Sequence, residues 1–80
     1  MKNVSQICFW IVGRSIAIDL HDENGELIRP AGFDEPIMVN VPATSQAERE
    51  SRGWSICIAI AQSHGLDADN VSYDADSTAA

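Results

Sequence analysis

The alternation of hydrophobic and polar residues first predicts two neighbouring strands. Residues 7–12 are apolar at every position and rich in aromatic and β-branched types, which is typical of a strand covered on both faces. Residues 15–20 alternate between polar and apolar, as a half-buried strand does. Gly13 and Arg14 lie between them and fit a two-residue type II′ turn, which prefers glycine first. The pattern therefore predicts an antiparallel hairpin.

A second hairpin and a further strand follow. Asn24 and Gly25 form the pair that tolerates positive φ at both central positions of a tight turn, and residues 26–28 are expected to return as a short strand. Two prolines and a glycine in residues 29–36 indicate a loop, because proline cannot donate to a strand ladder. Residues 37–41 alternate again and predict a fourth strand.

A single helix is predicted after this strand. Ser45 and Glu48 have the spacing of a capping box, in which each side chain accepts from the backbone amide of the other residue. The helix should run to about His64, after which Gly65 supplies the left-handed position of a Schellman ending and Leu66 its apolar contact. At 100° per residue, its apolar arc comprises Ala47, Gly53, Trp54, Ile56, Cys57, Ile58, Ile60, Ala61 and His64.

These elements define the fold class. Residues 71–73 are long enough for a last short strand, so the order is β-β-β-β-α-β. We expect a two-layer α+β domain, a mostly antiparallel sheet with one helix packed on one face. Residues 1–74 form this single domain, and residues 75–80 are expected to be a flexible acidic tail.

Composition limits the functional classes. The chain has 80 residues, 45% of them apolar, and a net charge of −7, which fits one small globular domain with a thin core. No apolar run reaches the roughly 20 residues of a membrane span. The scattered basic residues disfavour direct binding to nucleic acid, because phosphate neutralisation needs clustered Lys and Arg. We expect no direct nucleic-acid contact, no membrane association and a cytoplasmic protein.

Candidate chemical groups are few. Cys8 and Cys57 are each set among apolar neighbours, which indicates buried, reduced thiols rather than a disulfide or metal site. His21 and His64 are explained by a turn surface and by a helix C-terminus. Asp67, Asp69 and Asn70 resemble only the start of a calcium loop. Catalytic motifs are absent, so we expect no enzyme, no metal and no cofactor.

One apolar surface lacks an obvious cover. A single helix covers one face of the sheet, whereas the first strand is apolar on both. An uncovered strip of this kind favours a partner or a second copy, and the residues expected on it are Cys8, Trp10, Val12 and Met38. The alternative is that the loop at residues 29–36, with Phe33, folds over this face.

The negative charge is concentrated in two blocks. Residues 19–35 carry a net charge of −5 and residues 65–80 carry −4, whereas the helix region is balanced. Hairpin tips and chain ends are exposed, so these acids either serve solubility or dock on a basic groove of a partner. The candidate partner-binding acids are Asp19, Asp22, Glu23, Glu26, Asp34 and Glu35.

In size, acidity, absence of enzyme motifs and expected architecture, the chain resembles the small phage proteins that act against bacterial defences, notably anti-CRISPR proteins. The resemblance involves no motif and carries over no functional residue. It implies a phage-encoded inhibitor in a host–virus interaction, acting in the host cytoplasm by blocking the basic, nucleic-acid-binding surface of a protein complex. The alternative is a small homodimeric domain of antitoxin or accessory type, in which the apolar face forms the dimer and the acids provide solubility.

Overall fold

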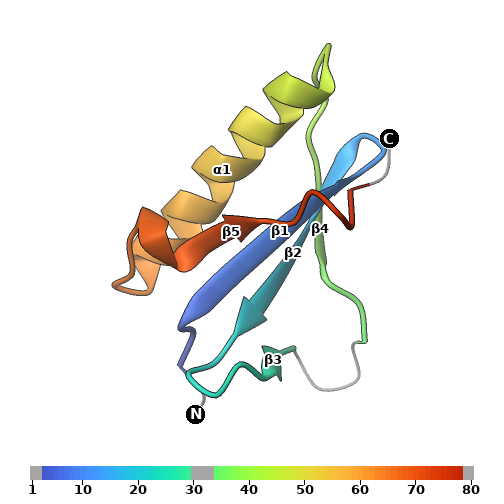
Figure 1. Ribbon diagram of the computed structural model, residues 1–80. Helices are drawn as coiled ribbons and strands as arrows, with labels where there is room; N and C mark the ends of the chain where they lie inside the picture. The colour runs from blue at the N-terminus through green and yellow to red at the C-terminus, as the bar shows by residue number, and fades with distance from the viewer. Residues whose placement is uncertain (1–2, 30–33, 79–80) are drawn as a thin grey trace.

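The computed structural model describes residues 3–29 and 34–78 of the chain. Its elements are β1 (Gln6–Val12), β2 (Ser15–His21), β3 (Leu27–Ile28), β4 (Ile37–Asn40), α1 (Gln46–Ser63), the short 3-10 helix η1 (Ala68–Asn70) and β5 (Val71–Tyr73) (Figure 1). The predicted order β-β-β-β-α-β and the two-layer α+β fold are confirmed.

The sheet is built around the first hairpin. The strand order is β3-β2-β1-β5. Strand β4 pairs with β2 on the same edge as β3: β3 lies beside the end of β2, and β4 lies beside its beginning. All pairs are antiparallel except β1 with β5. Helix α1 lies across one face of this sheet, mainly over β1 and β5 (Figure 1). The opposite face has no helix on it within the described residues.

The turn between β1 and β2 follows the sequence prediction. Val12 pairs with Ser15, so the loop is two residues long. Gly13 has a φ of +60°, and Arg14 keeps a negative φ, which is the combination of a type II′ turn. Glycine is required at the first position only.

The second turn differs from the prediction. His21 pairs with Leu27, so five residues connect the strands, and only Gly25 has a positive φ. The expected pair of positive φ angles at Asn24 and Gly25 is therefore wrong. The physical reason is the side chain of Asp22, which accepts hydrogen bonds from the amides of Asn24 and Glu26 and stabilises a wider loop.

The predicted N-cap of α1 is confirmed, but the second hydrogen bond of the predicted capping box is wrong. The Ser45 hydroxyl accepts from the amide of Glu48 at 3.1 Å, as predicted. The Glu48 carboxylate, however, accepts from the amide and hydroxyl of Thr44 rather than from the amide of Ser45. Thr44 offers two donors to one carboxylate, which lowers the pKa of Glu48 from its ordinary value.

The end of α1 is a Schellman motif, as predicted. Gly65 has a φ of +75°, its amide donates to Gln62, and the amide of Leu66 donates to Ala61. Leu66 packs against the core. The buried face of α1 is narrower than the predicted arc, because His64 and Ala47 at its two ends are exposed.

The core forms between α1 and the inward residues of β1 and β2. Ile7, Phe9 and Ile11 of β1 are fully buried, as are Ile16 and, to within 1%, Ile18 of β2. These residues alternate along their strands, so they share the face under α1.

Beyond β5 the chain continues alongside β1 in the same direction. The Thr78 hydroxyl accepts from the amide of Ile11 at 3.2 Å and lies 3.0 Å from the Tyr73 hydroxyl. The chain is thus hydrogen-bonded to the sheet as far as Thr78, within the segment where the sequence suggested a flexible tail.

Candidate binding surface

The hairpin formed by β2 and β3 carries both buried and exposed carboxylates. Asp22 is only 6% exposed, and its carboxylate receives the amides of Asn24 at 2.9 Å and Glu26 at 3.0 Å. A buried carboxylate that accepts backbone amides organises the turn. Asp22 therefore positions the hairpin tip, whereas the neighbouring Glu23 is exposed.

Asp19 is also engaged within the protein. The Arg29 guanidinium lies 2.7 Å from its carboxylate, and both side chains are largely buried. Arg29 also donates to the backbone carbonyl of Asp34, so it connects β2 to the loop that leads into β4. Arg29 is the only basic residue in residues 19–35. The sequence did not connect Arg29 with Asp19, because they are ten residues apart and meet only when β3 folds back on β2.

Four of the six predicted acids remain at the surface. They are Glu23, Glu26, Asp34 and Glu35, and all four are exposed. The first two lie at the hairpin tip and the other two before β4. The only basic residue of this block is already paired with Asp19, so Glu23, Asp34 and Glu35 leave the surface negative.

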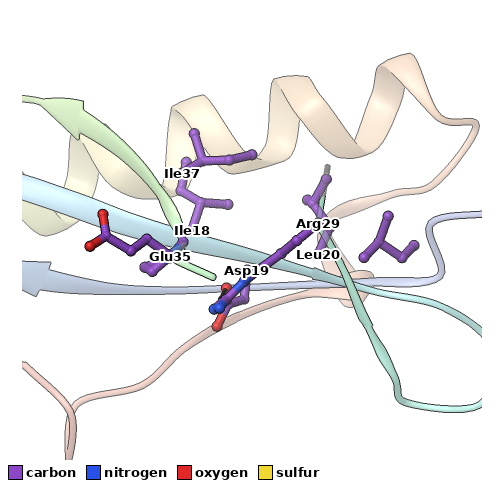
Figure 2. A pocket seen from close by; sticks show the side chains of 8 residues that line it. Ile18, Asp19, Leu20, Arg29, Glu35 and Ile37 are labelled. Carbon is purple, nitrogen blue, oxygen red and sulfur yellow. Dashed lines mark hydrogen bonds and ion pairs between the residues drawn. The ribbon is translucent and has the colours of Figure 1, made fainter. Parts of the chain in front are cut away.

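A groove of about 360 Å³ lies between the end of β3 and the beginning of β4, which follow one another along the edge of β2 with a gap opposite Asp19. Figure 2 shows its lining residues, with Asp19 and Arg29 close together at one side and Glu35 at another. The remainder of the lining is apolar: Ile18, Leu20, Ile28, Pro36 and Ile37. Exposed acids next to an apolar groove suit a partner that is basic but not uniformly polar.

The helix-free face of the sheet contains the predicted apolar strip. Cys8 and Trp10 are half-buried, whereas Val12 is 40% exposed and Met38 is 49% exposed. Ala17 pairs with both Trp10 and Met38 and is fully buried, so these residues join into one surface across three strands. Phe33, which would cover the strip if the loop folded over it, lies outside the described residues.

The two cysteines lie on opposite faces of the sheet. Cys57 faces the core from α1, and burial raises its pKa to about 12. Cys8 lies on the opposite sheet face, and its pKa is also raised, chiefly by burial. Both cysteines are free. In residues 3–29 and 34–78, no cluster of His, Cys, Asp or Glu could hold a metal ion.

Thiol labelling should distinguish the two cysteines. The thiolate is the reactive form, so at about pH 8 a thiol with a pKa near 12 is ionised in roughly one molecule in ten thousand. We expect an aromatic disulfide reagent to modify Cys8 slowly and Cys57 only after denaturant is added, as followed by mass spectrometry. Equal rates for the two thiols in the folded protein would contradict their placement on opposite faces.

No family model matches the chain, and neither a curated protein nor a solved structure matches it. Among the described residues, no helix is long and apolar enough to cross a membrane. The surfaces built from the acids, the groove and the apolar strip are therefore the basis on which a function is assigned.

Proposed function

We propose that this chain is a non-enzymatic binding protein whose acidic hairpin and loop dock on a basic, nucleic-acid-binding surface of a partner complex, in the manner of anti-CRISPR inhibitors. The observation that carries the proposal is the pairing of Arg29 with Asp19. This pairing consumes the only basic group of residues 19–35 and leaves Glu23, Asp34 and Glu35 exposed to a partner.

The physical basis is complementary charge. A negative surface speeds the encounter with a positive groove and repels nucleic acid that would compete for the same groove. The adjoining groove adds apolar area, which does not weaken in salt as the charged contacts do. Binding of this kind needs no catalytic group.

The test is retention of partners from an extract of the source cells by immobilised protein, followed by elution with a short DNA duplex or RNA. Glu23→Lys/Asp34→Lys should lose most of the retained protein, because each exposed substitution reverses a charge in the block. The matched control is Asp69→Lys/Asp76→Lys, which gives the same net charge at two exposed positions of the other block. Asp22 is unsuitable, because its removal would disrupt the turn.

The outcomes separate specific docking from general acidity. Retention that is lost in the first variant, kept in the control and reversed by nucleic acid supports the proposal. Retention that nucleic acid does not reverse, or that both variants lose equally, contradicts it, as does a failure of the wild-type protein to retain any partner.

A second candidate is a homodimeric interaction domain formed through Cys8, Trp10, Val12 and Met38. The observation that favours it is the 40% and 49% exposure of Val12 and Met38 on a sheet face without a helix. This candidate requires Trp10→Asp to abolish a dimer that the wild-type chain forms.

A further inference from the structure

Strand β4 has one edge that no described strand covers. It pairs with β2 through one side, and the amide of Val41 donates to Arg14 immediately beyond the last ladder pair. In an antiparallel strand the backbone N–H and C=O groups of successive residues point to alternate sides. The backbone groups of Ile37, Val39 and Val41 therefore point to β2, and those of Met38 and Asn40 point outward. The described chain offers these four groups no hydrogen-bond partner.

The sequence of this edge carries protection against pairing only at its two ends. Exposed edges are normally protected by charged residues, prolines or bulges, and residues 36–43 contain no charge. Pro36 and Pro42 take the outward positions on either side of Met38 and Asn40, and proline has no N–H to donate. The prolines thus restrict the hydrogen bonds of any added strand to the short segment between them, which is centred on Val39.

From these observations we propose that β4 is a dimerisation edge, which pairs antiparallel with β4 of a second copy so that the two sheets become one. In a two-fold arrangement with Met38 opposite Asn40 of the second copy, every outward N–H and C=O group of these two residues gains a partner. Val39 then lies opposite Val39 of the second copy, on the face of the sheet that carries α1.

Side-chain fit supports a second copy as the occupant. In this register Ile37 lies opposite Val41 of the other copy, on the same face. Ile37 is 47% exposed, and beside Val41 there is a hollow of about 290 Å³ lined by Asn40, Val41, Pro42, Arg52, Ser55 and Ile56. Each copy therefore offers an exposed isoleucine and a hollow to receive it.

Charge complementarity supports the same register. Glu35 of one copy lies opposite Ala43 of the other, next to Arg52, whose guanidinium donates to the carbonyl of Pro42. Both side chains are exposed in the single chain. Arg52 already forms an ion pair with Glu48 at 3.0 Å in the single chain, so in the dimer its guanidinium would lie between Glu48 and the incoming Glu35 at each end of the paired strands. This edge shares only Met38 with the strip around Trp10, using its backbone groups rather than its side chain, and the inference does not depend on the proposed function.

The test is the dissociation constant of the dimer, measured by sedimentation equilibrium with the whole chain at concentrations up to about 1 mM. Ile37→Lys should weaken the dimer at least tenfold, because it places a cation in the hollow beside Arg52. The matched control is Leu27→Lys, a similar change at a residue of β3 that is 45% exposed. Leu27→Lys should leave the dissociation constant unchanged.

A charge exchange tests the register at a second pair of positions. Glu35→Arg and Arg52→Glu should each weaken the dimer, and the two changes together should restore it. A wild-type chain that is monomeric at about 1 mM would overturn the proposal. So would a dimer that Trp10→Asp abolishes while Ile37→Lys leaves it intact, or a double variant no better than the single variants.

Discussion

Replacing Phe9 by alanine should lower the free energy of unfolding by about 3–5 kcal/mol, the usual loss when a buried aromatic side chain is removed. Phe9 is fully buried at the centre of the core. Its ring lies 5.4 Å from Trp54 in an edge-to-face arrangement and 5.1 Å from Tyr73. Truncation therefore removes aromatic contacts from the helix and from β5 together, and it leaves a cavity that neither element can fill.

The effect should be visible because small domains have little stability to lose. At the usual value of about 0.05–0.15 kcal/mol per residue, a chain of this length is stable by roughly 4–12 kcal/mol. Denaturant unfolding followed by circular dichroism, at one protein concentration for all variants, measures the change. Val12→Ala is the control, since Val12 lies on the same strand but is 40% exposed, and it should cost no more than about 1 kcal/mol. Equal losses at the two positions would contradict the central role of Phe9.

Replacing Gly53 by alanine should destabilise the protein by about 1–2 kcal/mol, although alanine is the better helix former by about 1 kcal/mol. A Cβ atom at this position would lie 2.5 Å from Cε2 of Phe9, and a second ring carbon is only 3.0 Å away. The ring cannot simply turn aside, because Trp54 and Tyr73 contact it. The helix must move away from β1 or the ring must leave its rotamer.

A double-mutant cycle separates this clash from the helix propensity of alanine. In a Phe9→Leu background the same Gly53→Ala change should be less destabilising by about 1 kcal/mol or more, because the smaller side chain leaves room for the methyl group. Ser55→Ala, on the exposed side of the helix, isolates the propensity effect and should stabilise by a few tenths of a kcal/mol. Additive effects of the changes at Phe9 and Gly53 would mean that the two residues do not meet.

The edge-to-edge dimer and the acidic docking surface would share Glu35 and the groove residue Ile37, but the hairpin tip stays clear of the dimer. The dimer occupies β4, whereas Glu23 and the hairpin tip project from the other end of β2. A dimer built this way would present two acidic hairpins on one continuous sheet. Two linked contacts raise the apparent affinity for a partner with repeated basic sites, so the Ile37→Lys variant should also weaken such a partner's binding.

The sequence alone determined much of the local structure. The apolar run of residues 7–12, the alternation of residues 15–20, the Gly13 turn, the Ser45 cap and the Gly65 ending are each governed by neighbours in the chain, and all are found close to their expected positions. Short-range rules suffice there, because the hydrogen bonds and φ angles involved connect residues a few positions apart. The fold class followed from the order of these elements.

Only the tertiary structure decided which polar groups face solvent and which edges stay open. Asp22 and Asp19 are acids in an acidic block by sequence. In the structure, Asp22 stabilises the turn and Asp19 pairs with Arg29, the residue after β3. β3 and β4 share one edge of β2, which opens the groove and leaves the far side of β4 without a partner strand in residues 3–29 and 34–78. This arrangement likewise depends on long-range register. Charge and strand propensity belong to single residues, whereas burial and pairing depend on which distant segment the folded chain brings alongside.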